Sequence, residues 1–183
     1  MKKISKLLLL FAALIVCCGT LKASEGPIHS VFWFSVSIKI DSENQKLEIL
    51  DSATTVNSGW LKDFQKAVKK GIAQHQVTIG PFHTEKEANN ARIYYKKSKD
   101  EINELPQPDA PSEMYWFAFG LTEKRIGSYK FKYCPFAVHA GSANEFTKDL
   151  FENLLYQFIV IGPFWDNIQA EEAKYIYRIV SKQ

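Results

Sequence analysis

The segment VTIGPFHTEKEANNARIYYKK, residues 77–97, returns later in the chain as IVIGPFWDNIQAEEAKYIYRIV, residues 159–180. When the two Gly-Pro-Phe triplets are aligned, two alanines and a tyrosine of each copy also match without a gap: Ala88 with Ala170, Ala91 with Ala173 and Tyr95 with Tyr177. The apolar run before Gly-Pro and the small residues after it predict a buried strand, a turn, and then a helix whose alanines face a sheet.

The repeat extends to the N-terminal side of each Gly-Pro-Phe triplet. A Trp-Phe pair opens each copy, and an apolar stripe with helical spacing follows it: Phe64, Val68 and Ile72 in the first copy, and Phe146, Leu150 and Leu154 in the second. We therefore predict an α+β protein made of two tandem β-β-α-β-α repeats, residues 30–99 and 113–183. The sheets are expected to be mainly antiparallel, with the helices packed on one face.

Local patterns predict the first elements of the first copy. Residues 31–40 are expected to form a strand whose apolar and polar side chains alternate from Phe34 onward, and residues 46–50 form the return strand of a hairpin. Residues 51–57 are expected to form a loop. Ser58 then caps a helix over residues 59–73.

The repeated segments themselves carry terminal signals. The strand at residues 77–79 should stop at Pro81, because proline has no amide proton to give to the ladder. Thr84, with a glutamate three residues later, forms a capping box for the next helix. In the second copy, Asp166 or Asn167 takes the corresponding capping position.

A linker separates the two copies at residues 100–112. Pro106, Pro108 and Pro111 fall close together there and are mixed with acidic residues. Such a run favours an extended, exposed chain. It is short enough to leave the two units in contact.

The first 23 residues have the layout of a secretory signal peptide. Residues 1–6 are basic, and residues 7–16 form an apolar run that is too short to span a bilayer as a helix. Cleavage before Ser24 would place Ala23 directly before the cleaved bond, where signal peptidase prefers a small residue. The alternative is a lipidated cysteine, Cys17 or Cys18, which would attach the protein to a membrane. Either route predicts a periplasmic or secreted protein, or a lipoprotein, of a bacterial envelope.

The net charge argues against a nucleic-acid partner. The whole chain has 23 basic and 20 acidic side chains, and residues 1–23 contain four of the lysines and no acid. The remainder therefore has 23 − 4 = 19 basic side chains against 20 acidic ones, a net charge of −1. Binding to nucleic acid requires a concentrated basic surface, and a net charge near zero does not recommend such a partner.

The segments at residues 77–95 and 159–177, each a strand, Gly-Pro-Phe and a helix with recurring alanines, resemble the second half of SPOR domains. The resemblance implies a ferredoxin-like α+β arrangement and the binding of peptidoglycan glycan strands that lack stem peptides, in the periplasm. Each copy differs from that family by opening with a hairpin. Each copy also lacks the strand with which a SPOR domain closes, so open sheet edges are expected that could accept a strand from an envelope protein.

Four aromatic side chains are candidate ligand-binding residues. Trp33 and Trp116 stand at the starts of the opening strands, and His83 and Trp165 directly follow the Gly-Pro-Phe triplets. Exposed aromatic rings of this kind stack on sugars. The alternative is that these rings fill the core or the contact between the two units.

Nothing in the sequence indicates catalysis, a metal site or a cofactor. No histidine has a second ligand at metal-binding spacing, and the chain contains no nucleophile motif and no phosphate-binding loop. Cys134, the single cysteine after residue 23, is expected to be a small core residue. We therefore predict a non-catalytic envelope-binding module. Its ligand would be a peptidoglycan glycan or, as the alternative, a protein partner in an envelope complex.

Overall fold

The computed structural model describes residues 30–41, 46–52, 55–74, 76–96, 102, 111–125, 128–131, 137–154 and 158–181. The predicted signal peptide, Cys17, Cys18 and Cys134 lie outside these ranges, as does most of the predicted linker. Ile102, a linker residue that the structure does describe, is buried rather than exposed.

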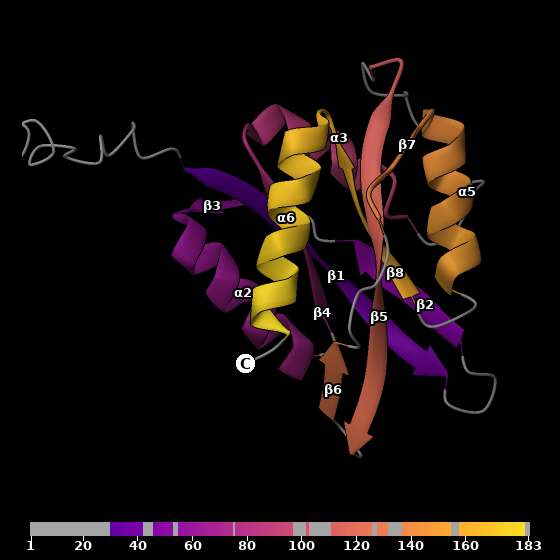
Figure 1. Cartoon of the computed structure of the whole chain (residues 1–183). Coiled ribbons are helices and arrows are strands. Elements are labelled where there is room, and N and C mark those ends of the chain that lie inside the picture. The colour runs from indigo at the N-terminus through magenta and orange to yellow at the C-terminus, as the bar shows by residue number, and fades with distance from the viewer. Residues whose placement is uncertain are drawn as a thin grey trace, which may run out of the picture.

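The described residues form two antiparallel sheets and four helices (Figure 1). The first half contains β1 (Val31–Asp41), β2 (Lys46–Ser52), β3 (Asn57–Gly59), α2 (Leu61–Ala73), β4 (Gln76–Phe82) and α3 (Glu85–Ile93). The second half contains β5 (Met114–Arg125), β6 (Ser128–Phe131), β7 (His139–Gly141), α5 (Ala143–Leu154), β8 (Phe158–Phe164) and α6 (Asn167–Val180). Both halves therefore present strands and helices in the same order.

A long strand lies at the centre of each sheet. Val36 of β1 is opposite both Ser52 of β2 and Val77 of β4, so β2 and β4 occupy different edges of β1. The short strand β3 pairs with the beginning of β1. In the same way β5 pairs with β6, β7 and β8. The predicted hairpins and the antiparallel pairing are confirmed.

The apolar stripes that the sequence predicts for α2 and α5 face the core. Phe64, Phe146 and Leu150 are fully buried, and Val68 is almost so. The alanines after each Gly-Pro-Phe triplet are also completely buried: Ala88, Ala91, Ala170 and Ala173. A methyl side chain lets a helix axis approach its sheet closely, so α3 and α6 pack against the strands through these positions.

Two predicted boundaries were wrong at the start of α2. The predicted loop at residues 51–57 is partly strand, because β2 runs to Ser52 and β3 begins at Asn57. Ser58 lies in β3 and does not cap the helix. Trp60 occupies the N-cap position, and its backbone amide donates to Asp63 Oδ2 at 3.2 Å. Pairing with β1 makes the ends of β2 and β3 extended, although the polar side chains of residues 51–57 indicate a loop.

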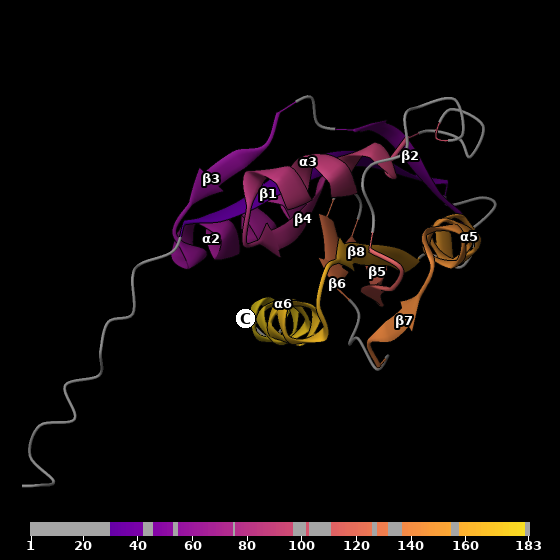
Figure 2. The same ribbon diagram turned by 90° about the horizontal axis from the view of Figure 1, so that it is seen from above.

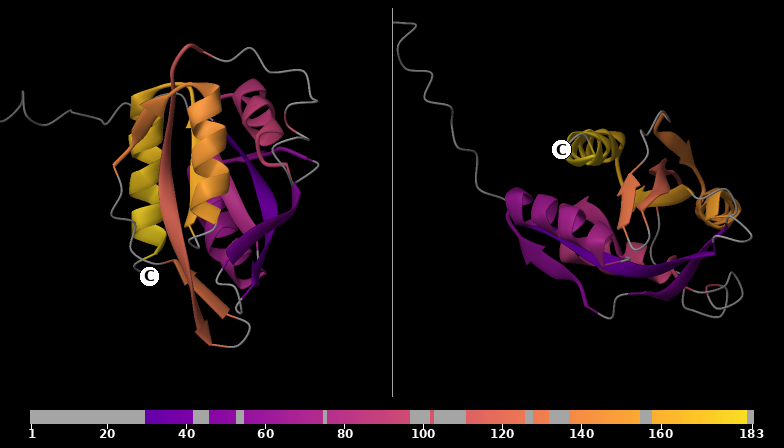
Figure 3. Two further views of the ribbon diagram at one scale, coloured as in Figure 1. Left: turned by 90° about the vertical axis from the view of Figure 1, so that its right-hand side faces the viewer. Right: turned by 90° about the horizontal axis from the view of Figure 1, so that it is seen from below.

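The helices do not share one face of the central strand, contrary to the prediction. Trp116 and Phe117 are neighbours in β5 and so point to opposite faces. The Trp116 ring contacts Phe146 of α5 at 5.5 Å, and the Phe117 ring contacts Tyr177 of α6 at 5.7 Å between centroids. Figure 3 shows β5 running between these two helices.

The Gly-Pro pairs lie inside strands and are not the turns that the sequence predicts. β4 continues to Phe82, which is opposite Phe32, although Ile79 is already opposite Phe34. One extra residue is therefore accommodated at Gly80-Pro81, as in a β-bulge. The bulge has a cis peptide bond and a glycine with φ of 144°, and β8 has the same features at Gly162-Pro163, with φ of 147°.

The inner edges of the two sheets meet through two tyrosines. The hydroxyl of Tyr95, which follows α3, lies 2.7 Å from the carbonyl oxygen of Val160 and 2.8 Å from that of Gly162, both in β8. The hydroxyl of Tyr177 in α6 donates to the carbonyl oxygen of Thr78 in β4. Each half thus supplies the donor for backbone acceptors on the inner strand of the other half.

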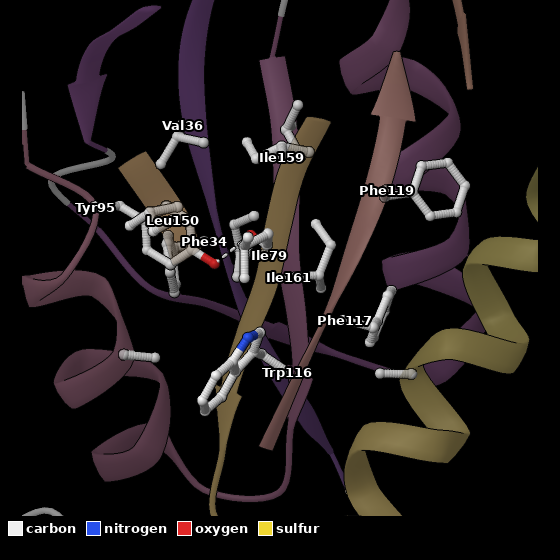
Figure 4. Packing of buried hydrophobic residues seen from close by; sticks show 14 of the residues in the cluster. Phe34, Val36, Ile79, Tyr95, Trp116, Phe117, Phe119, Leu150, Ile159 and Ile161 are labelled. Atoms are coloured by element: carbon white, nitrogen blue, oxygen red, sulfur yellow. Dashed lines mark hydrogen bonds between the residues drawn. The ribbon is translucent and has the colours of Figure 1, made fainter. Parts of the chain in front are cut away.

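Aromatic rings cross the same boundary in matching pairs. Figure 2 shows β4 of one sheet beside β8 of the other, and Figure 4 shows Tyr95 near Phe34 in the core. Tyr177 contacts Phe64 of α2 at 6.1 Å, and Tyr95 contacts Phe146 of α5 at 6.3 Å. Within its own half, Tyr95 packs edge-on against Phe34 at 5.4 Å. The two halves consequently share one hydrophobic core, which includes the buried residues of both sheets.

Replacing Gly80 or Gly162 by alanine is expected to destabilise the protein. Both glycines have a φ that side chains with a Cβ rarely adopt, and a Cβ at either position would lie 2.9 Å from a backbone oxygen, that of Phe32 or Tyr115. Strain of this kind costs about 1–3 kcal/mol. Urea unfolding should show this loss for each variant, whereas Lys69→Ala on the exposed side of α2 should change the free energy by less than about 0.5 kcal/mol. Unchanged stability of both glycine variants would contradict the bulge geometry.

Replacing Tyr95 or Tyr177 by phenylalanine should cost about 1–3 kcal/mol, because each change leaves a buried carbonyl without its donor. Tyr175→Phe is the matched control, since Tyr175 is 62% exposed on the same helix as Tyr177. Thermal and urea unfolding at neutral pH would measure the differences. Equal stability of all three variants would show that the hydroxyls contribute nothing.

Stability should also fall in alkaline solution. Burial raises the pKa of Tyr95 and of Tyr177 well above the usual value for tyrosine. Above about pH 10 the unfolded chain therefore releases protons that the folded state retains, and the free energy of unfolding decreases by up to about 1.4 kcal/mol per pH unit for each group. The double variant Tyr95→Phe/Tyr177→Phe should be less stable at pH 7 but show a shallower decline above pH 10. A parallel decline in both proteins would refute this.

Candidate binding surface at the starts of α3 and α6

The ends of β4 and β8 come together in the folded chain. Phe82 and Phe164, their last residues, are both fully buried, and their ring centroids are 5.4 Å apart. The residues that follow them are therefore delivered to one region of the surface. These residues are His83 and Trp165, two of the four candidate ligand-binding residues.

Each of these strands leads directly into a capped helix. Thr84 Oγ1 accepts from the Glu87 amide at 3.2 Å, and Glu87 Oε2 accepts from the Thr84 amide at 3.1 Å, so the predicted capping box is confirmed. Asp166 Oδ1 accepts from the Gln169 amide at 2.8 Å, which confirms Asp166 as the cap of α6. The two caps satisfy helix-start amides that would otherwise lack partners.

Polar side chains connect the two helix starts. Gln169 Nε2 donates to Glu87 Oε2 at 3.4 Å, and His83 Nε2 lies 3.7 Å from Glu172 Oε2. Glu87 Oε2 also accepts from the His83 backbone amide at 3.1 Å. We call the five residues His83, Glu87, Trp165, Gln169 and Glu172 the junction surface.

The junction surface combines exposed and buried polar groups. His83 and Glu172 are exposed, with side-chain exposures of 51% and 62%, and Trp165 is partly buried against the core. Gln169 is 1% exposed, and within the described part of the chain its Oε1 atom has no hydrogen-bond partner. A buried amide oxygen without a donor is unusual. The surface therefore offers an indole, an imidazole, carboxylates and an amide within a short stretch.

The other two candidates lie in the core. Trp33 is 7% exposed and packs edge-on against Phe64 at 5.9 Å. Trp116 is 3% exposed, and its Nε1 atom donates to Asp149 Oδ2 at 2.8 Å. Neither tryptophan presents a ring face on which a sugar could stack. Their positions agree with the alternative in which these rings fill the core.

Sequence reasoning overlooked Trp60, whose 50% exposure is the largest among the tryptophans that the structure describes. It lies at the N-cap of α2, where Ser, Thr, Asp and Asn are the preferred residues. Leu61 beside it is also exposed, at 44%. Local pattern gave no signal of this exposure, because Leu61 lies three and seven residues before Phe64 and Val68 and so continues their apolar stripe.

The junction surface has the chemistry of a binding site. Among the residues that the structure describes, no three His, Cys, Asp or Glu side chains are grouped as a metal ion would require. Within the described ranges, no helix is both long and apolar enough to cross a membrane. Hydrogen-bonding groups next to a partly buried indole suit a ligand with hydroxyl groups and a flat apolar face.

Comparison with known proteins gives no relative. No protein-family model, no curated protein and no solved structure matches the chain.

Replacing Glu87 by alanine should destabilise the junction surface, because Glu87 Oε2 accepts from two backbone amides and from Gln169. The expected loss is about 1–2 kcal/mol, since each hydrogen bond to a charged group contributes at about this level and the site is partly solvated. Glu85→Ala, in the same helical turn, should cost about 0.5 kcal/mol through the helix dipole alone. Urea unfolding of the two variants measures the difference, and equal losses would rule out a special role for Glu87.

Proposed function

We propose that the protein is a non-catalytic, SPOR-like binding module of the bacterial cell envelope, and that its ligand is a peptidoglycan glycan. The single observation that carries the proposal is the contact between Phe82 and Phe164, which gathers His83 and Trp165 on one surface. Two segments with a resemblance to glycan-binding domains then contribute to one site. The N-terminal layout of a signal peptide supports an envelope location.

The two halves are, in this proposal, copies of one ancestral β-β-α-β-α unit. The matched contacts support it, because pairs that correspond in the alignment also correspond in space. Phe34 stacks on Phe82 at 6.0 Å and 5°, and Phe117 stacks on Phe164 at 6.3 Å and 7°. The Gly-Pro bulges and the tyrosine donors correspond in the same manner.

A sugar chain suits the junction surface better than a rigid apolar ligand. Carboxylates and amides accept and donate hydrogen bonds to hydroxyl groups, and an indole face packs on the apolar side of a pyranose ring. Glu87 and Gln169 are held by backbone and cross-helix hydrogen bonds. A pre-organised site of this kind loses little conformational entropy when a ligand binds.

The alternative function, a protein-interaction subunit, depended on open sheet edges. The inner edges of β4 and β8 carry the carbonyl groups that accept from Tyr177 and Tyr95. Strand addition there would have to displace these tyrosines.

Purified sacculi test the proposed function. The chain starting at Ser24, which contains every described residue, should be retained by sacculi, and more strongly after amidase treatment has removed the stem peptides. The variant Trp165→Ala/His83→Ala should bind on the order of thirtyfold more weakly, as expected when an aromatic anchor is lost. The measurement is the bound fraction in a sedimentation assay across a range of sacculus concentrations.

Tyr175→Ala serves as the control, because it removes an exposed aromatic ring of α6 away from the helix start. Circular dichroism of each variant checks that it remains folded. Failure of the unaltered protein to bind either preparation would refute the proposal. Equal binding by the double variant and the control would show that the glycan binds at a site other than the junction surface.

A further inference from the structure

The outer side of α2 carries a basic and apolar surface that the proposed function does not use. Lys62, Lys66, Lys69 and Lys70 are all exposed. Their spacing places them on one side of the helix, since residues four and seven apart share a helical face. Trp60 and Leu61 are exposed at the beginning of the same helix. Leu61 lies three and seven residues before Phe64 and Val68, on the core side of the helix, so we call only the four lysines and Trp60 the α2 face.

The basic and aromatic parts of the α2 face are in contact. The Nζ atom of Lys62 lies 5.7 Å from the centre of the Trp60 ring, which is a cation–π distance. The cap position of α2 does not require a tryptophan side chain, because the cap is formed by the backbone of Trp60 and the carboxylate of Asp63. Half of a large apolar ring thus remains in solvent next to a positive charge.

The charge of α2 is not a general property of the fold. α2 contains four lysines and one aspartate, whereas α5, the helix at the corresponding place in the second half, contains one lysine and three acidic residues. Ser142 directly precedes α5, and Trp60 occupies the corresponding position before α2. The basic and apolar character is therefore confined to one of the two helices.

We propose that the α2 face docks the protein on the surface of an anionic phospholipid bilayer. The lysines would lie against the lipid head groups, where each contributes electrostatic attraction. Trp60 would enter the interface between head groups and acyl chains, where tryptophan is favoured. The apolar stripe of α2, including Phe64 and Val68, stays in the protein core, so the contact is peripheral and reversible.

A bilayer accounts for both parts of the α2 face. A soluble polyanion would attract the lysines but offers no apolar phase for the Trp60 ring. An apolar protein groove would take Trp60 but gains nothing from four lysines, which lose conformational freedom when they are ordered. An anionic membrane surface supplies negative charge and an apolar layer at once.

Vesicle sedimentation tests the proposal with the chain that starts at Ser24, so that the apolar residues 7–16 do not contribute. The protein should sediment with vesicles of phosphatidylglycerol and phosphatidylcholine in equal parts, and not with vesicles of phosphatidylcholine alone. High NaCl should release it, since salt screens the lysines.

Two variants separate the components of binding. Lys62→Gln/Lys66→Gln/Lys69→Gln should weaken binding on the order of a hundredfold, about fivefold for each lysine. Trp60→Ala should weaken it on the order of tenfold. Lys148→Gln on α5 and Ile168→Ser on α6 are matched controls, because both side chains are exposed elsewhere, and neither should change binding.

Three results would overturn the proposal. The first is no sedimentation of the unaltered protein with anionic vesicles. The second is equal sedimentation with both kinds of vesicle. The third is a loss of binding in the lysine variant with none in Trp60→Ala, which would assign the α2 face to soluble polyanions instead. Sacculus binding uses other residues and should be unaffected in every variant of α2.

Discussion

The structure depends on the hydrogen bonds that two buried tyrosines make across the boundary between its halves. The inner strands β4 and β8 pair on one side with a central strand, and their carbonyl groups on the other side need donors. Tyr95 and Tyr177 supply those donors from the opposite half. The carbonyl groups on the inner edge of each sheet accept hydrogen bonds from a tyrosine of the other half, so the two halves stabilise each other.

This exchange explains why the chain has one core although it has two sheets. The tyrosine rings are fully buried, and they pack against Phe64 and Phe146 on the helices of the other half. Burial of several aromatic rings at one boundary contributes stability beyond the hydrogen bonds. The meeting of Phe82 with Phe164 is a consequence, and it determines which exposed side chains can form a joint surface.

Much of the fold was accessible from local patterns. The alternation in β1 and the stripe at Phe64 and Val68 follow from side-chain periodicity, and the capping box at Thr84 from contacts between residues close in sequence. All three were predicted correctly. The bulge at Gly80-Pro81 was predicted as a turn, because a glycine and a proline give the same local signal in both. Pairing of Phe82 with Phe32, far away in the chain, decided the matter.

The sequence by itself determined the order of the helices and the longer strands, the buried face of each helix and the segments that resemble each other, since these follow from side-chain periodicity. It did not predict the short strands β3 and β7, which form by pairing with β1 and β5. Only the tertiary structure decided that Tyr95 donates to a strand 65 residues away and that Trp33 and Trp116 are core residues, whereas Trp60 is exposed. Periodicity reports whether a side chain faces a core. It does not report which distant segment of the chain packs against that side chain, and the burial of an aromatic ring depends on that segment.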